Sequence, residues 1–383
     1  MIEALVVVVI VIATALVFDF TNGFHDSANA MATSVATGAL TPRQAVTVAA
    51  ILNVIGAFLS TEVAKTISSG MVNDQLVTPE IVFAGLVGAI LWNLGTWLFG
   101  MPSSSSHALF GGLIGAVLVS AGLAGINPSV IISKILLPAI IAPVVAGLTA
   151  TYATRLAYRL TDRGEGHGRF SKAVFKHGQR ISASMVALAH GTSDGQKTMG
   201  IITLVLVSAG YQESGTRPYF WVILAAGLAI GLGTYSGGWR IMRTMGRGLV
   251  DIDSPQGFAA ETSSTVAILA SSHLGFGLST THVASGSILG SGIGRRTPVR
   301  WSTAVRMGVA WLLTLPAAGL IGGVAALMVK LGFGGLMLAL AMLIGVSAYF
   351  FWVSLKNRVH AGNVNDSRDV RVASRGTSGE AAS

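Results

Sequence analysis

The amino-acid sequence predicts an all-α polytopic membrane protein with the inverted-repeat architecture of a secondary transporter, including broken helices and re-entrant hairpins. The chain of 383 residues is 52% hydrophobic and only 11% charged, whereas about a quarter of the residues of a soluble domain are charged. A polar motif also occurs twice within apolar sequence, about half a chain apart. Duplicated halves with interrupted apolar segments are typical of secondary transporters.

Apolar segments near the roughly 20-residue length that spans a bilayer follow one another along the chain. They are 3–18, 24–38, 43–62, 81–99, 104–120, 131–155, 181–209, 219–237, 257–274, 279–292, 303–329 and 333–355. Segments 24–38, 104–120 and 279–292 are short and begin at Gly-, Ser- or Pro-rich breaks. Such breaks occur at membrane depth only where the backbone is buried in protein or lines a cavity. We therefore expect half-helices there, and re-entrant hairpins over 81–120 and 257–292.

Lys and Arg residues indicate the orientation in the membrane. If the two hairpins enter from opposite faces, 20 of the 25 Lys and Arg residues fall on one side, and the positive-inside rule makes that side cytoplasmic. The halves are then inverted, with the N-terminus outside and the C-terminus inside, and the expected location is the plasma membrane (the inner membrane of a bacterium). This asymmetry explains the pI near 10.2 without a nucleic-acid partner.

The same patterns divide the chain into four parts. We expect an N-terminal transmembrane repeat over 1–160, a basic cytoplasmic linker over 161–180, a C-terminal inverted repeat over 181–355 and a disordered cytoplasmic tail over 356–383. The first 18 residues lack the basic leading region of a signal peptide, so we expect a retained helix. The chain has no Cys, which excludes disulfides, thiolate catalysis and Cys-ligated metals.

The first repeated motif places carboxylates within apolar sequence. Its copies are Asn22–Ala32 and His190–Gly200, and they share Gly, Asp, an amide or ammonium side chain, and Met at equal offsets. A carboxylate at membrane depth costs at least a few kcal/mol. We therefore expect Asp26 and Asp194 to bind the substrate and the coupling cation or proton, with Asn22 contributing to the cation site.

The residues three positions after these acids are Asn29 and Lys197. A buried ammonium group needs a partner, which an anionic substrate supplies if Asp194 is committed to a cation. Asn29 would donate its amide hydrogens to the same anion from the other half. The alternative is structural, with Asp194 paired to Lys197 or capping a helix.

The second repeated motif is rich in hydroxyl groups. Aligned on His107 and His282, each copy has three hydroxyl residues before the histidine and glycines four and eight positions after it: Ser104, Ser105 and Ser106, then Ser279, Thr280 and Thr281. Each cluster opens an apolar half-helix, whose unpaired N–H groups and positive dipole end favour an anion. The structural alternatives are helix caps and small packing residues.

Three further side chains are candidates for ion coupling. His107 and His282 are either proton carriers or hydrogen-bonded structural histidines. Glu261 has no carboxylate counterpart in the first hairpin, so it either couples to protons or lies near the cytoplasmic surface.

Together, the four motifs resemble those of the inorganic phosphate transporter (PiT) family, over about residues 15–355. The resemblance implies a central phosphate site held by the Asp/Asn, Asp/Lys and Ser/Thr motifs, with cation sites beside it. Coupling in that family is to H⁺ or Na⁺, and some bacterial members carry neutral metal–phosphate complexes. Ser193 stands where the family usually has Asn before the second Asp, so one cation-coordinating carbonyl is missing and H⁺ is favoured over Na⁺.

The resulting expectation is a cation-coupled inorganic phosphate symporter in the lipid bilayer, without enzymatic activity, a resident cofactor or a dedicated metal site. Transport of Mg²⁺ or another divalent metal with phosphate, and a homodimeric state, are left open. The alternatives are a transporter of another oxyanion such as sulfate, a passive channel, and an intramembrane hydrolase using Ser105 or Ser106, His107 and Asp26. The sequence lacks the Gly-x-Ser-x-Gly and His-Glu-x-x-His motifs of common hydrolases.

Overall fold

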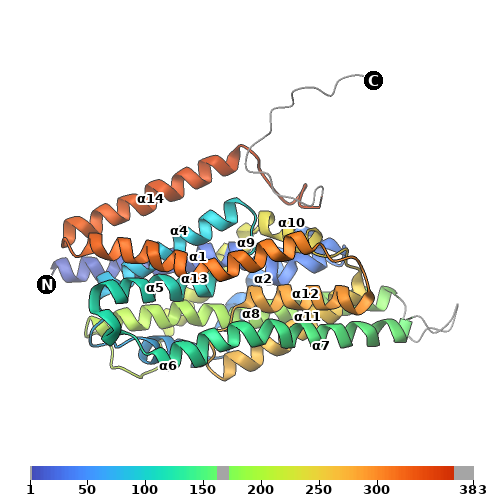
Figure 1. The fold of residues 1–383 in the computed structure, drawn as a ribbon, viewed down its shortest axis with the longest axis horizontal. Coiled ribbons are helices and arrows are strands. Elements are labelled where there is room, and N and C mark those ends of the chain that lie inside the picture. Colours follow the sequence, from blue (N-terminus) through green and yellow to red (C-terminus); the bar gives the residue numbers. More distant parts are fainter. Residues whose placement is uncertain (1, 162–171, 366–383) are drawn as a thin grey trace, which may run out of the picture.

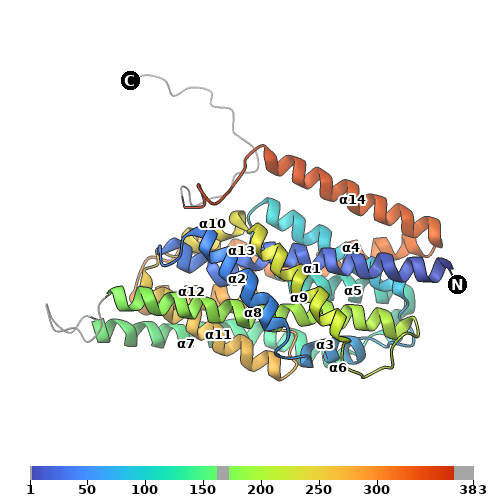
Figure 2. The ribbon, with the colours of Figure 1, turned by 180° about the vertical axis from the view of Figure 1, so that it is seen from behind.

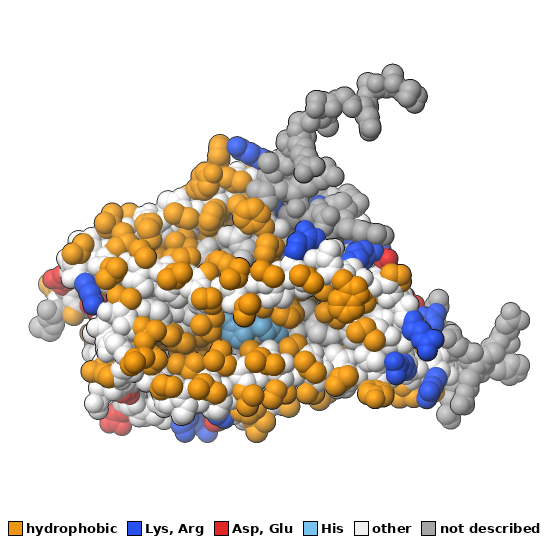
Figure 3. Space-filling model, in the orientation of Figure 1, with side chains coloured by type: hydrophobic (Ala, Val, Ile, Leu, Met, Phe, Trp, Pro, Cys, Tyr) orange, Lys and Arg blue, Asp and Glu red, His pale blue; other side chains and the backbone are white. Residues whose placement is uncertain are grey.

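The computed structural model describes residues 2–161 and 172–365 as helices packed side by side along the longest axis of the molecule (Figure 1). Six helices in these ranges are long and apolar enough to cross a membrane, or eight if each of two bent helix pairs counts as one span. Hydrophobic side chains cover much of the surface along the helices (Figure 3). The protein is therefore a multi-pass membrane protein, as the composition predicted.

The two halves have matching orders of helices. The first half contains α1 (Ile2–Ala36), α2 (Pro42–Ala57), α3 (Glu62–Thr66), α4 (Pro79–Leu98), α5 (Ser105–Ala121), α6 (Pro128–Val130) and α7 (Leu137–Thr161). The second contains α8 (Lys172–Ser208), α9 (Phe220–Ser236), α10 (Trp239–Arg247), α11 (Ser254–His273), α12 (Thr280–Arg295), α13 (Trp301–Val329) and α14 (Phe333–Leu355). Short π-helical turns at Ile67–Met71 and Ile131–Leu136 and a 3₁₀ turn at Gly122–Gly125 complete the first half.

Helices α1 and α8 correspond to each other and run in opposite directions (Figure 2). Helix α2 bends by 63° into the α3 segment, and its counterpart α9 bends by 68° into α10. The contacts repeat as well, since α1 packs on α9 while α8 packs on α2. The inverted repeat predicted from the two motifs is confirmed.

The two re-entrant hairpins, α4–α5 and α11–α12, meet at their tips. Ser104 Oγ accepts a hydrogen bond from the backbone N–H of His107 at 3.1 Å and thereby caps α5, and Ser279 caps α12 in the same way. The hydroxyl of Ser106 donates to the carbonyl of Leu278 at 3.1 Å. The N-terminal ends of α5 and α12 therefore face each other in the middle of the molecule, as predicted for half-helices.

The long helix that follows the hairpin in each repeat covers the hairpin of the other repeat. Helix α13 packs along α5, and α7 packs along α12. Glycines allow these approaches, because a Cβ atom at Gly115 would lie 2.0 Å from the carbonyl oxygen of Gly319, and one at Gly290 would lie 2.0 Å from that of Gly147. This exchange ties the two halves into one unit.

Substitution of Gly115 by Ala is expected to separate α5 from α13. The new methyl group would meet backbone rather than a flexible side chain, and overpacking of this kind costs about 1–3 kcal/mol. Thermal unfolding of the purified protein in detergent measures the effect. The matched control is Gly345→Ala in α14, where a Cβ meets nothing within 4 Å. Equal melting of G115A and G345A would contradict the close contact.

The predicted break at the start of segment 24–38 is wrong, because α1 is continuous from Ile2 to Ala36. The glycine that suggested the break has a packing function instead. A Cβ atom at Gly23 would lie 2.3 Å from the carbonyl oxygen of Ile230 in α9, and its counterpart Gly191 stands equally close to the carbonyl oxygen of Asn53 in α2. Both motif glycines therefore bring α1 and α8 against their neighbours.

The boundaries of the predicted linker and tail also differ in the structure. Helix α8 begins at Lys172, within the segment 161–180 that was expected as linker. In the expected tail, Val364 is buried and the carbonyl of Asn363 accepts a hydrogen bond from Arg243 at 2.6 Å, so this part is packed against α10. The remaining linker and tail positions, 162–171 and 366–383, lie outside the described residues.

Candidate functional site

The candidate site lies where α1 and α8 pass the two hairpin tips. It combines the polar motifs of all four elements, and each of its side chains is at most 7% exposed. The members are Asp26 and Asn29 from α1, Ser105 and Ser106 from α5, Asp194 and Lys197 from α8, and Thr280 and Thr281 from α12. The structure thus brings together eight of the ten predicted substrate-binding residues, and the other two are the caps of α5 and α12.

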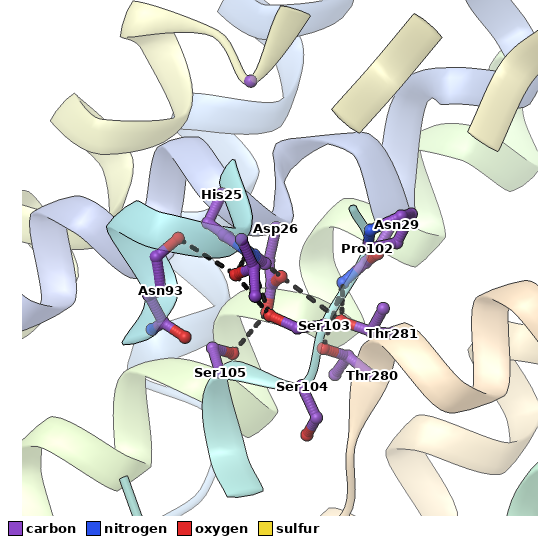
Figure 4. Close-up of polar contacts among 12 residues, drawn as sticks. His25, Asp26, Asn29, Asn93, Pro102, Ser103, Ser104, Ser105, Thr280 and Thr281 are labelled. Carbon is purple, nitrogen blue, oxygen red and sulfur yellow. Dashed lines mark hydrogen bonds and ion pairs between the residues drawn. The ribbon is translucent and has the colours of Figure 1, made fainter. Parts of the chain in front are cut away.

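The motif of α1 contacts both tips (Figure 4). Asp26 accepts hydrogen bonds from Ser105 Oγ at 2.5 Å and from Thr281 Oγ1 at 3.3 Å. Asn29 Nδ2 donates to Thr281 Oγ1 at 3.0 Å and lies 3.4 Å from Thr280 Oγ1. One acid and one amide of the first repeat are therefore held between hydroxyls of both repeats.

The motif of α8 has the same relation to the tips. Lys197 Nζ donates to Asp194 Oδ1 at 2.5 Å and to Ser106 Oγ at 2.5 Å. Thr280 Oγ1 lies 3.3 Å from the second oxygen of Asp194. The pairing of Asp194 with Lys197, expected as a structural alternative, is present, and the ammonium group also reaches the tip of α5.

Two motif histidines that do not match between the copies, His25 and His190, contact the acids. His25 Nδ1 lies 2.8 Å from Asp26 Oδ1, and His190 Nε2 lies 3.4 Å from Asp194 Oδ2. The other ring nitrogen of His190 lies 3.2 Å from Asn53 Oδ1 on α2. The spacing of four residues between His190 and Asp194 was the available signal, because it places both on one helix face.

Asp26, His190 and Asp194 form a candidate cation site. One ligand atom of each lies within 4.8 Å of the others, and all three side chains are buried. Carboxylate oxygens suit hard cations such as Na⁺ and Mg²⁺, and a neutral imidazole adds a ligand for a transition metal. A cation here would offset the repulsion between two buried carboxylates. No dedicated metal site was predicted, but the acids were predicted to bind the coupling cation.

Several buried polar atoms beside the acids have no hydrogen-bond partner among residues 2–161 and 172–365. They include Asn29 Oδ1, Ser193 Oγ and both side-chain polar atoms of Asn93. Asn93 lies next to Ser105 (Figure 4). Buried polar groups are normally paired, and leaving them unpaired costs free energy. The donors among these atoms are the amide nitrogen of Asn93 and the hydroxyl of Ser193. Together with the ammonium group of Lys197 and the two helix N-termini, they favour a bound anion.

The remaining predicted coupling residues are placed around this centre. The rings of His107 and His282 lie 4.8 Å apart, and His282 stacks on Trp311 at 4.2 Å. Within the described chain, the Nε2 atoms of both histidines and both side-chain polar atoms of Asn22 lack hydrogen-bond partners. His107, His282 and Asn22 remain candidates for coupling. Neither histidine forms a hydrogen bond with Asp26 or Asp194 in the described part of the chain.

Glu261 lies apart from the centre, in a polar cluster that joins α1, α8 and α11. Its carboxylate accepts hydrogen bonds from Thr33 at 2.5 Å, Ser182 at 2.5 Å and Gln179 at 3.1 Å. The side chain is only 3% exposed, so it does not lie at the open cytoplasmic surface. The structure does not bring Glu261 together with Asp26.

One acidic residue was missed in the sequence. Asp19 lies in α1, seven residues before Asp26, and is fully buried. The position seven residues before Asp194 is Ala187, so comparison of the two copies gave no signal. The signal that was available is helical spacing, because Asp19, Asn22 and Asp26 are separated by three and four residues and share one face of α1.

Comparison with known proteins places this architecture among phosphate transporters. The model of the phosphate transporter family matches residues 22–165 and again 161–322. A probable low-affinity inorganic phosphate transporter of Mycobacterium tuberculosis (strain ATCC 25618 / H37Rv) is 52% identical over 94% of this chain and 87% of its own length. One from Bacillus subtilis (strain 168) is 39% identical over 84% and 96%. A solved structure described as the sodium-dependent phosphate transporter has a TM-score of 0.77, 24% identity, and coverage of 86% of this chain and 100% of that chain.

Proposed function

This chain belongs to the phosphate transporter family, and we propose that it imports inorganic phosphate together with a cation by alternating access. The observation that carries the proposal is the meeting of two hydroxyl-rich helix N-termini with Lys197, between two buried acids, at the interface of the repeats. The relatives named above are inorganic phosphate transporters. The fold neighbour and these relatives are transporters rather than enzymes.

Each part of the site has a distinct chemical role in this proposal. The N-termini of α5 and α12, Lys197 and Asn29 supply donors to the phosphate oxygens. Asp26 and Asp194 bind the cation or accept a hydrogen bond from a protonated phosphate. Sulfate carries no proton at neutral pH and cannot donate to a carboxylate, so the pair of acids favours phosphate over sulfate.

The hydrolase alternative receives no support from the geometry. The hydroxyl of Ser105 donates to Asp26 rather than to a histidine, and that of Ser106 donates to the carbonyl of Leu278. Nε2 of His107 has no hydrogen-bond partner in the described part of the chain. A nucleophile and a base within hydrogen-bond reach of each other are the signature of such an enzyme.

The site is closed on both sides, since all its side chains are buried. Access from either side therefore requires a hairpin tip to move away from α1 and α8. Because the repeats are inverted, the same movement made by the other hairpin would open the other side. Alternating access then follows when the two hairpin tips open in turn, one toward each side of the membrane.

The proposed orientation has the N-terminus outside and the C-terminus in the cytoplasm, in the plasma membrane. Most of the Lys and Arg side chains visible in Figure 3 gather toward the end opposite the N-terminus. Under the positive-inside rule, that end is cytoplasmic. Phosphate import then runs from the N-terminal end of α1 toward its C-terminal end.

The coupling ion has two candidates. The first is H⁺, which Ser193 in place of an Asn favours. The second is a metal cation bound by Asp26, His190 and Asp194, and this cation can be a divalent metal that is carried with phosphate. Uptake experiments separate these candidates directly.

Uptake of radiolabelled phosphate into proteoliposomes tests the function. The arms are an inward H⁺ gradient, an inward Na⁺ gradient and no gradient, each with and without Mg²⁺, and each with excess sulfate as competitor. We expect concentrative uptake that one cation gradient drives and that sulfate does not inhibit. Flux that only equilibrates phosphate would indicate a channel. Inhibition by sulfate at equal potency, or the absence of uptake by folded protein, would contradict the proposal.

A further inference from the structure

A polar cavity at the C-terminal end of α14 lies outside the roles assigned above. It has a volume of about 280 Å³ and is lined by α1, the end of α4, the junction of α9 with α10, and the end of α14 with the residues that follow it. Arg240, Arg358 and His360 contribute to its wall, whereas no Asp or Glu of the described chain lines it. The charge of the cavity therefore favours an anionic ligand.

The positive charge of Arg240 is buried without an acidic partner. Its side chain is 3% exposed and donates hydrogen bonds to three carbonyl oxygens, that of Leu98 at 2.8 Å, that of Ser354 at 2.8 Å and that of Asn357 at 2.7 Å. Among residues 2–161 and 172–365, no carboxylate forms an ion pair with this guanidinium group. The carbonyls hold the group in place but leave its charge uncompensated, which is costly for a buried ion.

A second, apolar cavity continues from the polar one along α1, α4 and α14. It has a volume of about 490 Å³, and Phe20 and Phe351 line both cavities. No charged residue of the described chain lines it. Helix α14 lies at the edge of the bundle (Figures 1 and 2), and in the wall of this cavity Val17 is 50% exposed and Ile344 is 61% exposed. The apolar cavity is therefore a groove that is open to the lipid.

The groove has the length of one acyl chain within a leaflet. Its wall extends over residues 10–21 of α1 and 340–351 of α14, and each stretch is about 16 Å long at about 1.5 Å per residue. Half of the hydrocarbon core of a bilayer is about 15 Å thick. Trp97 and Trp239 line the polar cavity at the other end, and tryptophan is enriched at the membrane–water interface. The two cavities thus match the chain and the headgroup of a lipid.

We propose that the two cavities together bind an anionic phospholipid of the cytoplasmic leaflet. Its phosphate group lies beside Arg240 and accepts hydrogen bonds from Arg358, whose planar guanidinium group suits phosphate oxygens, while one acyl chain fills the groove. A zwitterionic lipid would place a cation of its own next to these arginines, so a net negative charge is favoured. The choice of leaflet rests on the proposed orientation of the chain, but the site itself does not.

A lipid at this position connects three helices that meet at Arg240. The hydrogen bonds of Arg240 join α10 to the ends of α4 and α14, and a phosphate group beside it supplies the missing negative charge. The acyl chain fills the space that α14 leaves against α1 and α4. We therefore expect the anionic lipid to stabilise the protein, because it binds the folded chain and not the unfolded one.

Thermal unfolding of the purified, delipidated full-length protein in detergent tests the site without requiring transport. Phosphatidylglycerol is titrated at a fixed detergent concentration. The parallel ligands are phosphatidylcholine with the same acyl chains, and glycerophosphoglycerol, which is the same anionic headgroup without acyl chains. We expect phosphatidylglycerol to raise the melting temperature in a saturable manner, phosphatidylcholine to bind at least about tenfold more weakly, and glycerophosphoglycerol to have no effect at the same concentrations.

Two variants address the two ends of the site. Arg358→Gln removes the exposed guanidinium group, and Ser347→Phe fills the groove with an aromatic ring. Each should weaken the binding of phosphatidylglycerol at least about tenfold. The matched controls are Arg159→Gln, at an exposed arginine of α7, and Ala341→Phe, at an exposed position of α14 that lines neither cavity. Both controls should bind the lipid as the wild type does, and unfolding without lipid confirms that each variant is folded.

Three results would overturn the site. The first is equal stabilisation by phosphatidylcholine or by glycerophosphoglycerol, which would show that the anionic lipid as a whole is not selected. The second is wild-type affinity for phosphatidylglycerol in folded R358Q and S347F. The third is a delipidated dimer that S347F converts to a monomer, which would assign the groove to a second copy of the chain. Phosphate uptake enters none of these measurements, so failure of the proposed function would leave the lipid site in place.

Discussion

Substitution of Lys197 by Met is expected to abolish phosphate uptake and to destabilise the protein. The ammonium group is fully buried and donates to Asp194 and Ser106, both at 2.5 Å. Met fills the space of the aliphatic stem but leaves the carboxylate of Asp194 without its cation. Removal of one partner of a buried ion pair costs about 3–5 kcal/mol. Uptake in proteoliposomes and thermal unfolding in detergent measure the two effects.

The double variant Asp194→Asn with Lys197→Met separates structure from function. Because it removes both charges, we expect it to recover most of the stability lost in K197M while transport stays absent. Lys65→Met is the control, since Lys65 lies on the exposed side of α3 and should leave both properties unchanged. Wild-type uptake by folded K197M would show that the ammonium group does not bind the substrate. Failure of the double variant to recover stability would show that the pair is not the source of the loss.

The sequence predicted the centre of the molecule well because the repeat itself was the signal. Two copies of each motif identified Asp26, Asp194 and the hydroxyl clusters, and the structure brings these groups within hydrogen-bonding distance. The half-helices at the hairpin tips were also predictable. A Ser followed by a long apolar run is a cap signal that depends only on local sequence.

What the sequence did not provide depends on contacts between the halves. Gly23 suggested a break because a glycine has the same local appearance in a broken helix and in a close helix crossing, and only the position of Ile230 decides between them. Asp19 was missed because Ala187 occupies the equivalent position of the second repeat, so the comparison of the two copies gave no signal. The packing of α7 on the hairpin of the second repeat, and of α13 on that of the first, likewise depends on tertiary contacts. The sequence pattern of one half does not show which residues of the other half will contact it.

Substitution of Asp26 by Asn is expected to reduce concentrative phosphate uptake by about 10- to 100-fold while the protein stays folded. The amide has the shape of the carboxylate, and its oxygen can still accept the hydrogen bond from Ser105. It lacks the charge that would hold a cation or accept a proton next to His190 and Asp194. Interactions with a charged group contribute about 1.5–3 kcal/mol, and the upper value corresponds to slightly more than a factor of 100.

Whether D26N loses phosphate accumulation or phosphate binding distinguishes a coupling role of Asp26 from a purely structural one. If Asp26 binds the coupling cation, D26N should lose accumulation against a gradient and its dependence on the cation, but should still bind phosphate, because Lys197 and the tips of α5 and α12 remain. Phosphate binding and gradient-driven uptake are therefore measured on the same preparation. Asp74→Asn, which makes the same change outside the site at a half-buried residue that accepts a hydrogen bond from Ser214, is the control and should behave as the wild type. Accumulation at the wild-type rate by folded D26N would remove Asp26 from the coupling site and leave Asp194 and His190 to bind the cation without it.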